Sequence, residues 1–237
     1  MKIRCEKLEA AYGKNTVLSD FDVSFPADSV NTVIGPSGSG KSTLLRLIAA
    51  LENPRDGSIY YDDRPHTELH PREIRDKVGM IFQKPTLFEG TVYDNLNFGL
   101  KIRKKMLEPE EITKVLKNVD IPLEYLDKTG DELSIGEQQR ICIIRSLLLD
   151  PEAILLDEPV SALDPQRANR VLKLIRSLKT DYKKTVIMVS HNMNDALKIS
   201  DRIFFIWQGN ILLEGSPETI KESDNEVLRK FMAGEYE

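Results

Sequence analysis

The sequence predicts an α/β protein built on a mainly parallel sheet, and three observations support this prediction. A β-branched run at residues 30–34 enters a glycine-rich turn, and an apolar helical pattern starts directly afterwards at Lys41. After residue 153, apolar strands alternate with segments of helical spacing, an order typical of parallel sheets covered by helices. Between residues 84 and 145 helical spacing dominates. We therefore expect a helical insertion within an α/β core.

The elements before residue 84 are mostly strands. Alternating or β-branched apolar residues predict strands at 3–8, 17–25, 30–34, 57–61 and 78–82. One helix, from Lys41 to about Leu51, follows the glycine-rich turn. The insertion carries helical patterns at 91–100, 109–119 and 136–149.

The second half of the core begins with the run Ala153 to Leu156, which predicts a strand buried on both faces, as in parallel sheets. Asp164 is expected to cap a helix with Pro165 at its first position. The apolar stripe of that helix consists of Val171, Leu174, Ile175 and Leu178. A strand at 185–189, a helix at 193–199, a hairpin at 202–214 turning at Gly209-Asn210, and a helix at 225–232 follow.

Composition narrows the class of protein. The 237 residues can bury a sizeable core, and 33 Lys and Arg against 38 Asp and Glu give a net charge of −5. No global basic field therefore favours a nucleic-acid partner. Cys5 and Cys142 lack metal-binding spacing, and we interpret them as reduced intracellular thiols.

The membrane signals in the sequence are weak. The N-terminus has no apolar segment typical of a secretory signal, and the longest apolar runs fall far short of the ~20 residues that span a bilayer. We expect a soluble chain, for which any membrane role depends on a partner.

The strongest functional signal is the turn after the strand at 30–34. It fits the phosphate-binding pattern G-x-x-x-x-G-K-[ST], with a strand before it and a helix after it. Glycines let successive N–H groups converge on phosphate oxygens, next to the positive end of the helix. Lys41 is expected to meet the β- and γ-phosphates, and the Ser42 hydroxyl to meet Mg²⁺. The predicted nucleoside triphosphate site comprises Gly35, Pro36, Ser37, Gly38, Ser39, Gly40, Lys41, Ser42 and Thr43.

Two adjacent carboxylates end the buried strand at 153–156. Neighbouring strand residues point to opposite faces, so Asp157 and Glu158 cannot share one role. At the carboxyl edge of a parallel sheet, one can hold Mg²⁺ while the other faces an attacking water. An ordinary polar strand end is the alternative interpretation.

Later motifs resemble, in order and spacing, those of the nucleotide-binding subunit of ATP-binding cassette (ABC) transporters. Residues 133–140 resemble the family signature, whose usual core is Leu-Ser-Gly-Gly-Gln, and residues 161–164 resemble the D-loop. Gln83 matches the Q-loop glutamine, His191 the switch histidine, and Tyr12 the aromatic residue that stacks on adenine. The matching motifs run from Tyr12 to His191, and the strand layout fits nearly the whole chain.

This resemblance implies a P-loop NTPase fold with an N-terminal antiparallel β subdomain and an inserted helical subdomain. The whole chain would form one ATPase domain, with the core at 1–83 and 146–237 and the helical subdomain at 84–145. The implied catalytic residues are Glu158, His191 and Lys41. Mg²⁺ would be held by Ser42, Gln83 and Asp157. ATP would in addition meet Tyr12, Gln83, Ser134, Gly136 and Asp164.

The signature departs from the family pattern at two positions. Ile135 replaces a glycine and Glu137 replaces the usual glutamine, which leaves Ser134 and Gly136 as the implied phosphate contacts. Ser134 and Glu137 also fit a capping box that starts a helix. Both interpretations are compatible, because a helix N-terminus is itself an anion site.

The resemblance also implies partners. Two copies, or two paired cassettes, would sandwich two ATP molecules and drive separate permease subunits from the cytoplasmic face of the membrane. Short motifs at 83–85, 93–95, 140–145 and 190–193 are similar to those of phosphate-import ATPases. The alternatives are a soluble cassette acting on ribosomes or DNA, and a nucleotide-gated module without hydrolysis. The apolar residues Pro85, Leu87, Phe88 and Val92 form either a partner surface or part of the core.

Overall fold

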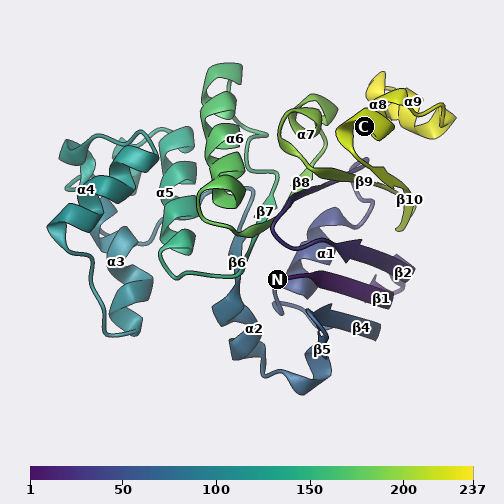
Figure 1. Ribbon diagram of the computed structural model, residues 1–237, viewed down its shortest axis with the longest axis horizontal. Coiled ribbons are helices and arrows are strands. Elements are labelled where there is room, and N and C mark those ends of the chain that lie inside the picture. The colour runs from purple at the N-terminus through teal and green to yellow at the C-terminus, as the bar shows by residue number, and fades with distance from the viewer. Residues whose placement is uncertain (237) are drawn as a thin grey trace.

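The computed structural model describes residues 1–236, which fold into two sheets flanked by helices (Figure 1). The strands are β1 (Ile3–Tyr12), β2 (Asn15–Phe25), β3 (Val30–Ile34), β4 (Asp56–Tyr61), β5 (Arg64–Pro65), β6 (Val78–Ile81), β7 (Ala153–Asp157), β8 (Thr185–Ser190), β9 (Arg202–Trp207) and β10 (Asn210–Gly215). The helices are α1 (Lys41–Ile48), α2 (Pro71–Lys77), α3 (Val92–Ile102), α4 (Pro109–Asn118), α5 (Ile135–Leu147), α6 (Pro165–Thr180), α7 (Met193–Ile199), α8 (Pro217–Glu222) and α9 (Glu226–Met232).

The core sheet has the strand order β10-β9-β3-β8-β7-β6. Strands β9, β3, β8, β7 and β6 pair in parallel, and β10 adds an antiparallel edge. Every residue of β3, β7 and β8 is buried, as expected for strands covered on both faces. Since β3, β7 and β8 are neighbours in parallel register, their carboxyl ends meet at one edge, with Ile34 opposite Ser190 and Asp157 opposite Val189.

The second sheet is antiparallel and has the order β2-β1-β4-β5. Its inner face packs on α1 and on one side of the core sheet, where Leu8, Phe21 and Phe25 are fully buried. The edge of the Phe25 ring packs against Phe204 of β9, with centroids 4.9 Å apart. This sheet therefore braces the helix that follows the glycine-rich turn, and it matches the antiparallel subdomain expected at the N-terminus.

Helices α3, α4 and α5 gather on the opposite side of the molecule (Figure 1). Their inner faces join the cluster that also covers β6, β7 and α6, with Leu96, Leu116 and Ile144 buried at its centre. Helix α5 continues to Leu147, two residues past the expected subdomain boundary at 145. The division into core and helical subdomains thus stays a prediction whose boundary lies within a helix.

Several predicted boundaries are corrected by the structure. Helix α1 ends at Ile48 rather than Leu51, because Ala50 adopts a positive φ of 51° that no helix continues. The final hairpin turns at Gln208 and Gly209, both at positive φ, so Asn210 already belongs to β10. Two positive φ values are what a tight hairpin turn requires.

Two short helices were absent from the prediction. Helix α2 is capped by His70, whose ring accepts a hydrogen bond from the Arg72 amide while Glu73 accepts one from the His70 amide. Helix α8 is capped by Ser216. Proline stands at the first helical position of both, which is a sequence signal for a helix start.

The structure also bears on the two cysteines and on the search for membrane-spanning helices. Cys5 and Cys142 are both buried and free. None of the helices formed by residues 1–236 combines the length and apolar composition needed to cross a bilayer.

Candidate functional site

The glycine-rich turn connects β3 to α1 at the carboxyl edge of the core sheet. Gly35 and Gly40 have φ values of 154° and 99°, a region that favours glycine. A Cβ on Gly35 would collide with the carbonyl oxygen of Ile206, and one on Gly40 would lie 2.7 Å from the Leu18 side chain. The path of the turn therefore depends on glycine at both positions for conformational and steric reasons.

Lys41 lies inside the turn rather than on its surface. Its residue is 5% exposed, and its Nζ donates hydrogen bonds to the carbonyl oxygens of Gly35 and Pro36 at 2.8 and 2.7 Å. Burial lowers the pKa of Lys41, and the carboxylates of Glu158 and Asp157 oppose that shift. An ammonium group held at the centre of a turn of backbone amides is placed to meet an anion.

Ser39 strengthens this interpretation. Its hydroxyl oxygen is buried and has no hydrogen-bond partner within residues 1–236. A buried hydroxyl without a partner is costly, so the turn has hydrogen-bonding capacity that a bound phosphate oxygen would satisfy. The residues of the turn thus fit the triphosphate predicted for them.

Ser42 and Asp157, two of the predicted Mg²⁺ ligands, lie together. The Ser42 hydroxyl donates a hydrogen bond of 2.8 Å to Oδ1 of Asp157, which joins the start of α1 to the end of β7. Burial raises the pKa of Asp157, and the hydrogen bond from Ser42 opposes that shift. A hydroxyl and a carboxylate are oxygen ligands of the kind Mg²⁺ prefers when it shares its shell with phosphates and water.

Glu158 faces a different set of partners from Asp157, as predicted, although Glu158 lies just past the end of β7 rather than within the strand. Oε2 of Glu158 lies 3.1 Å from Nδ1 of His191 and accepts a hydrogen bond of 3.0 Å from Nε2 of Gln83. Glu158 has a φ of 45°, and its amide donates to the carbonyl oxygen of Val189 on β8. The backbone thus turns sharply after β7, which directs the second carboxylate away from Ser42.

Gln83 contacts Glu158 rather than the Ser42 and Asp157 pair. Its amide nitrogen also lies 3.4 Å from Oγ of Ser161, a residue that sequence reasoning did not single out as a separate contact. Within residues 1–236, no cluster of three or more His, Cys, Asp or Glu forms a metal site. A metal ion here would therefore depend on phosphate oxygens as further ligands.

A cavity of about 290 Å³ opens beside Glu158 and His191. Ser161 and Leu163 of the predicted D-loop line it, together with residues from the start of α6 and α7. Asp164 lies next to this cavity and caps α6, accepting hydrogen bonds from the amides of Gln166 and Arg167. Its capping role explains Asp164 structurally, and a contact with ATP stays a prediction.

Ser134 and Gly136 lie at the start of α5, outside the cavity of Glu158 and His191. The capping box is present: Glu137 accepts hydrogen bonds from the amide of Ser134 at 2.8 Å and from its hydroxyl at 2.7 Å. Ile135 is 48% exposed at the first helical position. A contact of Ser134 and Gly136 with ATP therefore stays a prediction.

Tyr12 ends β1 with 48% of its surface exposed. Its hydroxyl donates a hydrogen bond of 2.6 Å to Oε2 of Glu52 and lies 3.5 Å from the hydroxyl oxygen of Thr43. The Tyr12 hydroxyl is thus held near the start of α1, and stacking of the ring on adenine stays a prediction. Nothing in the sequence pattern pointed to Glu52, because the pair joins residues 40 apart without a shared motif.

Comparisons with known proteins agree with this geometry. The sequence profile described as "ABC transporter" matches residues 18–161. The phosphate import ATP-binding protein PstB of Thermotoga maritima is 37% identical, over 98% of this chain and 97% of its own. ABC transporter I family member 17 of Arabidopsis thaliana is 35% identical, over 98% and 88%. Other relatives are named for sulfate/thiosulfate import and probable amino-acid transport.

The fold has solved counterparts. A dimeric post-hydrolysis structure of the ATP-binding cassette MJ0796, bound to ADP and Pi, superposes with a TM-score of 0.79. It is 28% identical and covers 91% of this chain and 98% of its own. The profile spans more than half of the chain, and the relatives align over nearly all of it. The chain therefore belongs to the ABC transporter family and is one of its ATP-hydrolysing cassettes.

Proposed function

We propose that two copies of this chain, or this chain and a paired cassette, enclose two ATP molecules and drive small-solute import through separate membrane subunits. The observation that carries the proposal is the convergence at one sheet edge of Lys41, the Ser42 and Asp157 pair, and the Glu158 and His191 pair. This edge offers charge stabilisation, a metal position and a base within one site.

Positioning and electrostatics do most of the work in phosphoryl transfer. Lys41 and the backbone N–H groups of residues 37–42 bind the β- and γ-phosphates and stabilise the negative charge that develops on them. Ser42 and Asp157 would hold Mg²⁺, with Gln83 as the third predicted ligand. When bound, Mg²⁺ supplies further neutralisation of the phosphate oxygens.

Glu158 is proposed to accept a proton from the attacking water. His191 lies 3.1 Å from Oε2 of this carboxylate and orients it, while Gln83 donates a hydrogen bond to the same oxygen. Two hydrogen-bonding neighbours restrict the rotation of the Glu158 side chain, which keeps the base in place for in-line attack on the γ-phosphate.

Dimerisation completes the proposed site. Ser134 and Gly136 meet the γ-phosphate held by the facing copy, with the helix N-terminus of α5 adding its positive end. The dimeric form of MJ0796 with ADP and Pi supports the proposal that the chain dimerises. The γ-phosphate is then both substrate and cross-link, so its loss reopens the pair.

A groove of about 500 Å³ between the core and α3 supports a membrane partner. The apolar residues expected near Gln83 divide here: Val92 is buried and Leu87 packs on the core, whereas Phe88 is exposed and Pro85 lines the groove. Phe88 stacks on Phe98 at a centroid distance of 3.9 Å. The Arg145 guanidinium lies over the Phe88 ring, 4.5 Å from its centroid.

The groove is lined by further exposed apolar side chains, Phe82, Phe98 and Ile102. Its proposed occupant is a short amphipathic helix from the cytoplasmic side of a permease, since apolar grooves of this size accept such helices. The chain would then lie peripherally on the inner face of the membrane.

The test is recovery of the tagged chain with its membrane partner, followed by reconstitution in vesicles. Phosphate, sulfate and amino-acid uptake driven by ATP are compared, and phosphate uptake is expected. The variant Ile102→Glu should lose the partner and keep ATP binding, whereas Leu123→Glu, at an exposed position outside the groove, should keep both. Recovery of ribosomes or DNA in place of a membrane protein contradicts the transport proposal.

A further inference from the structure

A second cavity, of about 550 Å³, lies between α4, α5 and α6. None of its lining residues lines the cavity of Glu158 and His191, and none belongs to the glycine-rich turn. Nothing in the proposed ATPase mechanism uses it. Its lining is unusual for this chain, because cations predominate in a protein of net charge −5.

Arg140 of α5 lines this cavity. The residue is 3% exposed, and its Nε is buried without a hydrogen-bond partner within residues 1–236. No ion pair in the same range involves Arg140, although its guanidinium keeps five N–H donors and a permanent charge. A buried charge without a partner is costly, so this group lacks a counter-ion that the cavity has room to supply.

The charged residues around Arg140 do not supply the missing counter-ion. Burial lowers the pKa of Arg140; Glu137 and Asp120 raise it, and the cations Arg170 and Arg167 lower it. The nearby carboxylates therefore do not offset the loss of hydration. An anion bound against the Arg140 guanidinium would offset this loss of hydration.

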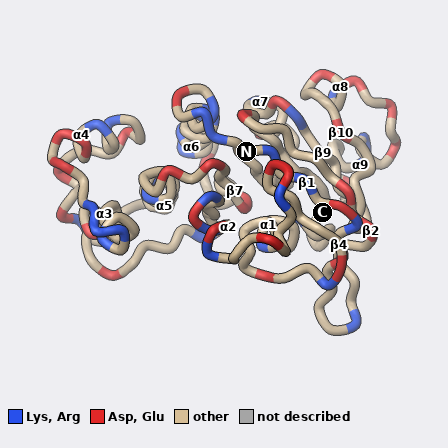
Figure 2. Tube along the Cα trace, turned by 60° about the horizontal axis from the view of Figure 1, so that its bottom comes forward, with Lys and Arg blue, Asp and Glu red and all other residues tan. Residues whose placement is uncertain are grey.

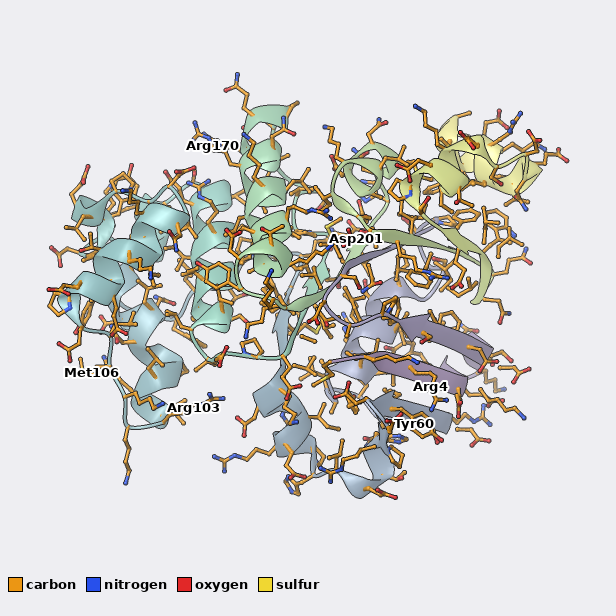
Figure 3. All side chains as sticks on the ribbon, in the orientation of Figure 1. Arg4, Tyr60, Arg103, Met106, Arg170 and Asp201 are labelled. Carbon is orange, nitrogen blue, oxygen red and sulfur yellow. The ribbon has the colours of Figure 1, made fainter. Side chains whose placement is uncertain are left out.

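The rim adds three exposed cations, Lys114, Arg170 and Lys173. None of them forms an ion pair within the described part of the chain, and with Arg140 they outnumber the two lining carboxylates, Asp120 and Asp181. Lys and Arg positions appear in blue along α4 and α6 in Figure 2, and Figure 3 shows Arg170 projecting from α6 on the side of α5.

A neutral donor completes the lining. Tyr182 accepts a hydrogen bond of 2.8 Å from Nδ2 of Asn118, and both residues line the cavity. Because the Tyr182 oxygen already accepts, its own proton is free to be donated to a ligand. The cavity thus combines a buried guanidinium, an exposed cationic rim and a hydrogen-bonded hydroxyl.

We propose that this cavity binds a phosphate group, either as free inorganic phosphate or as the terminal phosphate of a small organic molecule. A guanidinium fork matches two oxygens of a phosphate, and the rim cations and Tyr182 address the remaining oxygens. The volume lies within the range of small-molecule sites. The proposal is independent of the ATPase mechanism, because it uses none of the residues assigned to ATP.

The experiment is a titration followed by nuclear magnetic resonance of the ¹⁵N-labelled chain, observing the Arg140 Nε–H signal. Inorganic phosphate and glycerol 3-phosphate are the probes, and chloride at equal ionic strength is the reference. A saturable shift of the Arg140 signal is expected with both phosphates and none with chloride. If the two probes bind with equal affinity, the ligand is free inorganic phosphate. If glycerol 3-phosphate binds more tightly than inorganic phosphate, the ligand is an organic phosphate.

The two cation substitutions are chosen on the exposed rim, so that folding is preserved, and Tyr182→Phe keeps the aromatic ring. The double variant Arg170→Gln and Lys173→Gln should weaken binding at least tenfold, and Tyr182→Phe should weaken it severalfold. Lys117→Gln removes an exposed cation from α4 outside the cavity and should change the affinity by less than twofold. The proposal is overturned if the Arg140 signal does not saturate, if chloride shifts it equally, or if Lys117→Gln matches the double variant.

Discussion

Nδ1 of His191 lies 3.1 Å from Oε2 of Glu158, which joins the loop after β8 to the residue that follows β7. The two strands are neighbours in parallel register, so the contact follows from sheet topology rather than from closeness in sequence. The same oxygen accepts a hydrogen bond from Gln83, which follows β6. Three successive strand ends thus converge on one carboxylate.

The first prediction concerns that carboxylate. Glu158→Gln should bind ATP normally, lower ATP turnover by about two to four orders of magnitude, and accumulate a dimer, because a neutral amide cannot take a proton from water. Steady-state ATP turnover measures the first effect, and the molar mass from light scattering measures the dimer. Glu152→Gln, in a surface ion pair with Lys77, is the matched control and should behave like the parent. Hydrolysis by Glu158→Gln at the parent rate would show that the base lies elsewhere.

The second prediction concerns Ile135, which stands where the family usually has glycine. Ile135→Gly should leave ATP turnover within roughly tenfold of the parent, because Ser134 and Gly136 carry the proposed phosphate contact. The free energy of unfolding should fall by about 0.5–1 kcal/mol, the usual cost of glycine in a helix. Steady-state kinetics and thermal unfolding check the two parts. A change of roughly thousandfold in either direction would assign Ile135 a role of its own.

The third prediction concerns Glu137. Burial alone would raise its pKa, but the hydrogen bonds from the hydroxyl and amide of Ser134 hold the pKa below its ordinary value, so the carboxylate is charged. In the closed dimer this charge would face the γ-phosphate of the other copy. Glu137→Gln should therefore tighten the ATP-dependent dimer by about tenfold, since like charges across an interface are repulsive.

Sedimentation in the Glu158→Gln background measures this dimer, because ATP is then not consumed. Glu124→Gln makes the same charge change at an exposed position of the helical insertion and should leave the dimer unaffected. A dimer weakened by Glu137→Gln would show that the capping interaction matters more than the repulsion.

The fourth prediction is a pH dependence of stability at Asp201, which is labelled in Figure 3. Burial alone would raise its pKa, but Lys179, the Val30 amide and Arg176 hold the pKa below its ordinary value. The hydrogen bonds measure 2.8 Å from Lys179, 2.8 Å from the Val30 amide and 3.0 Å from Arg176. A carboxylate with a lowered pKa stabilises the fold above its unfolded pKa of about 3.9, and that stability is lost as pH falls through the folded pKa.

Asp201→Asn should accordingly lower the free energy of unfolding at pH 7 by about 1–3 kcal/mol. The difference from the parent should shrink as the pH falls below about 4, where the parent carboxylate also becomes neutral. Urea unfolding at several pH values measures this, with Asp63→Asn at an exposed position as control. A difference that stays constant with pH would assign the loss to packing or geometry rather than charge.

The parts of the fold that the sequence predicts are those in which a local pattern has a single physical cause. The strand at 30–34 is predicted to the residue, and the start of α1 follows from the glycine-rich turn. The α6 stripe is confirmed as buried at Val171, Leu174, Ile175 and Leu178. Helices α2 and α8 were missed although Pro71 and Pro217 mark their starts, because neither has enough apolar residues to show a helical period.

The parts that the sequence leaves open are contacts between distant segments. The orientation of Gln83 toward Glu158, the hydrogen bond between Tyr12 and Glu52, and the unpaired guanidinium of Arg140 all depend on three-dimensional placement. Likewise, Leu87 and Phe88 are equal in pattern, yet one packs inward and the other is exposed. Apolar character alone cannot separate these two environments.

Helix α5 connects three surfaces in one continuous rod of 13 residues, about 20 Å in length at 1.5 Å per residue. Its first turn presents Ser134, its middle holds Arg140, and its last turn places Arg145 against the carbonyl oxygen of Thr86 at 2.8 Å. A helix of this length resists bending, so a tilt imposed at its tip displaces its far end in the opposite sense. A displacement of the first turn of α5 would therefore be transmitted along the same rod to Arg140 and Arg145.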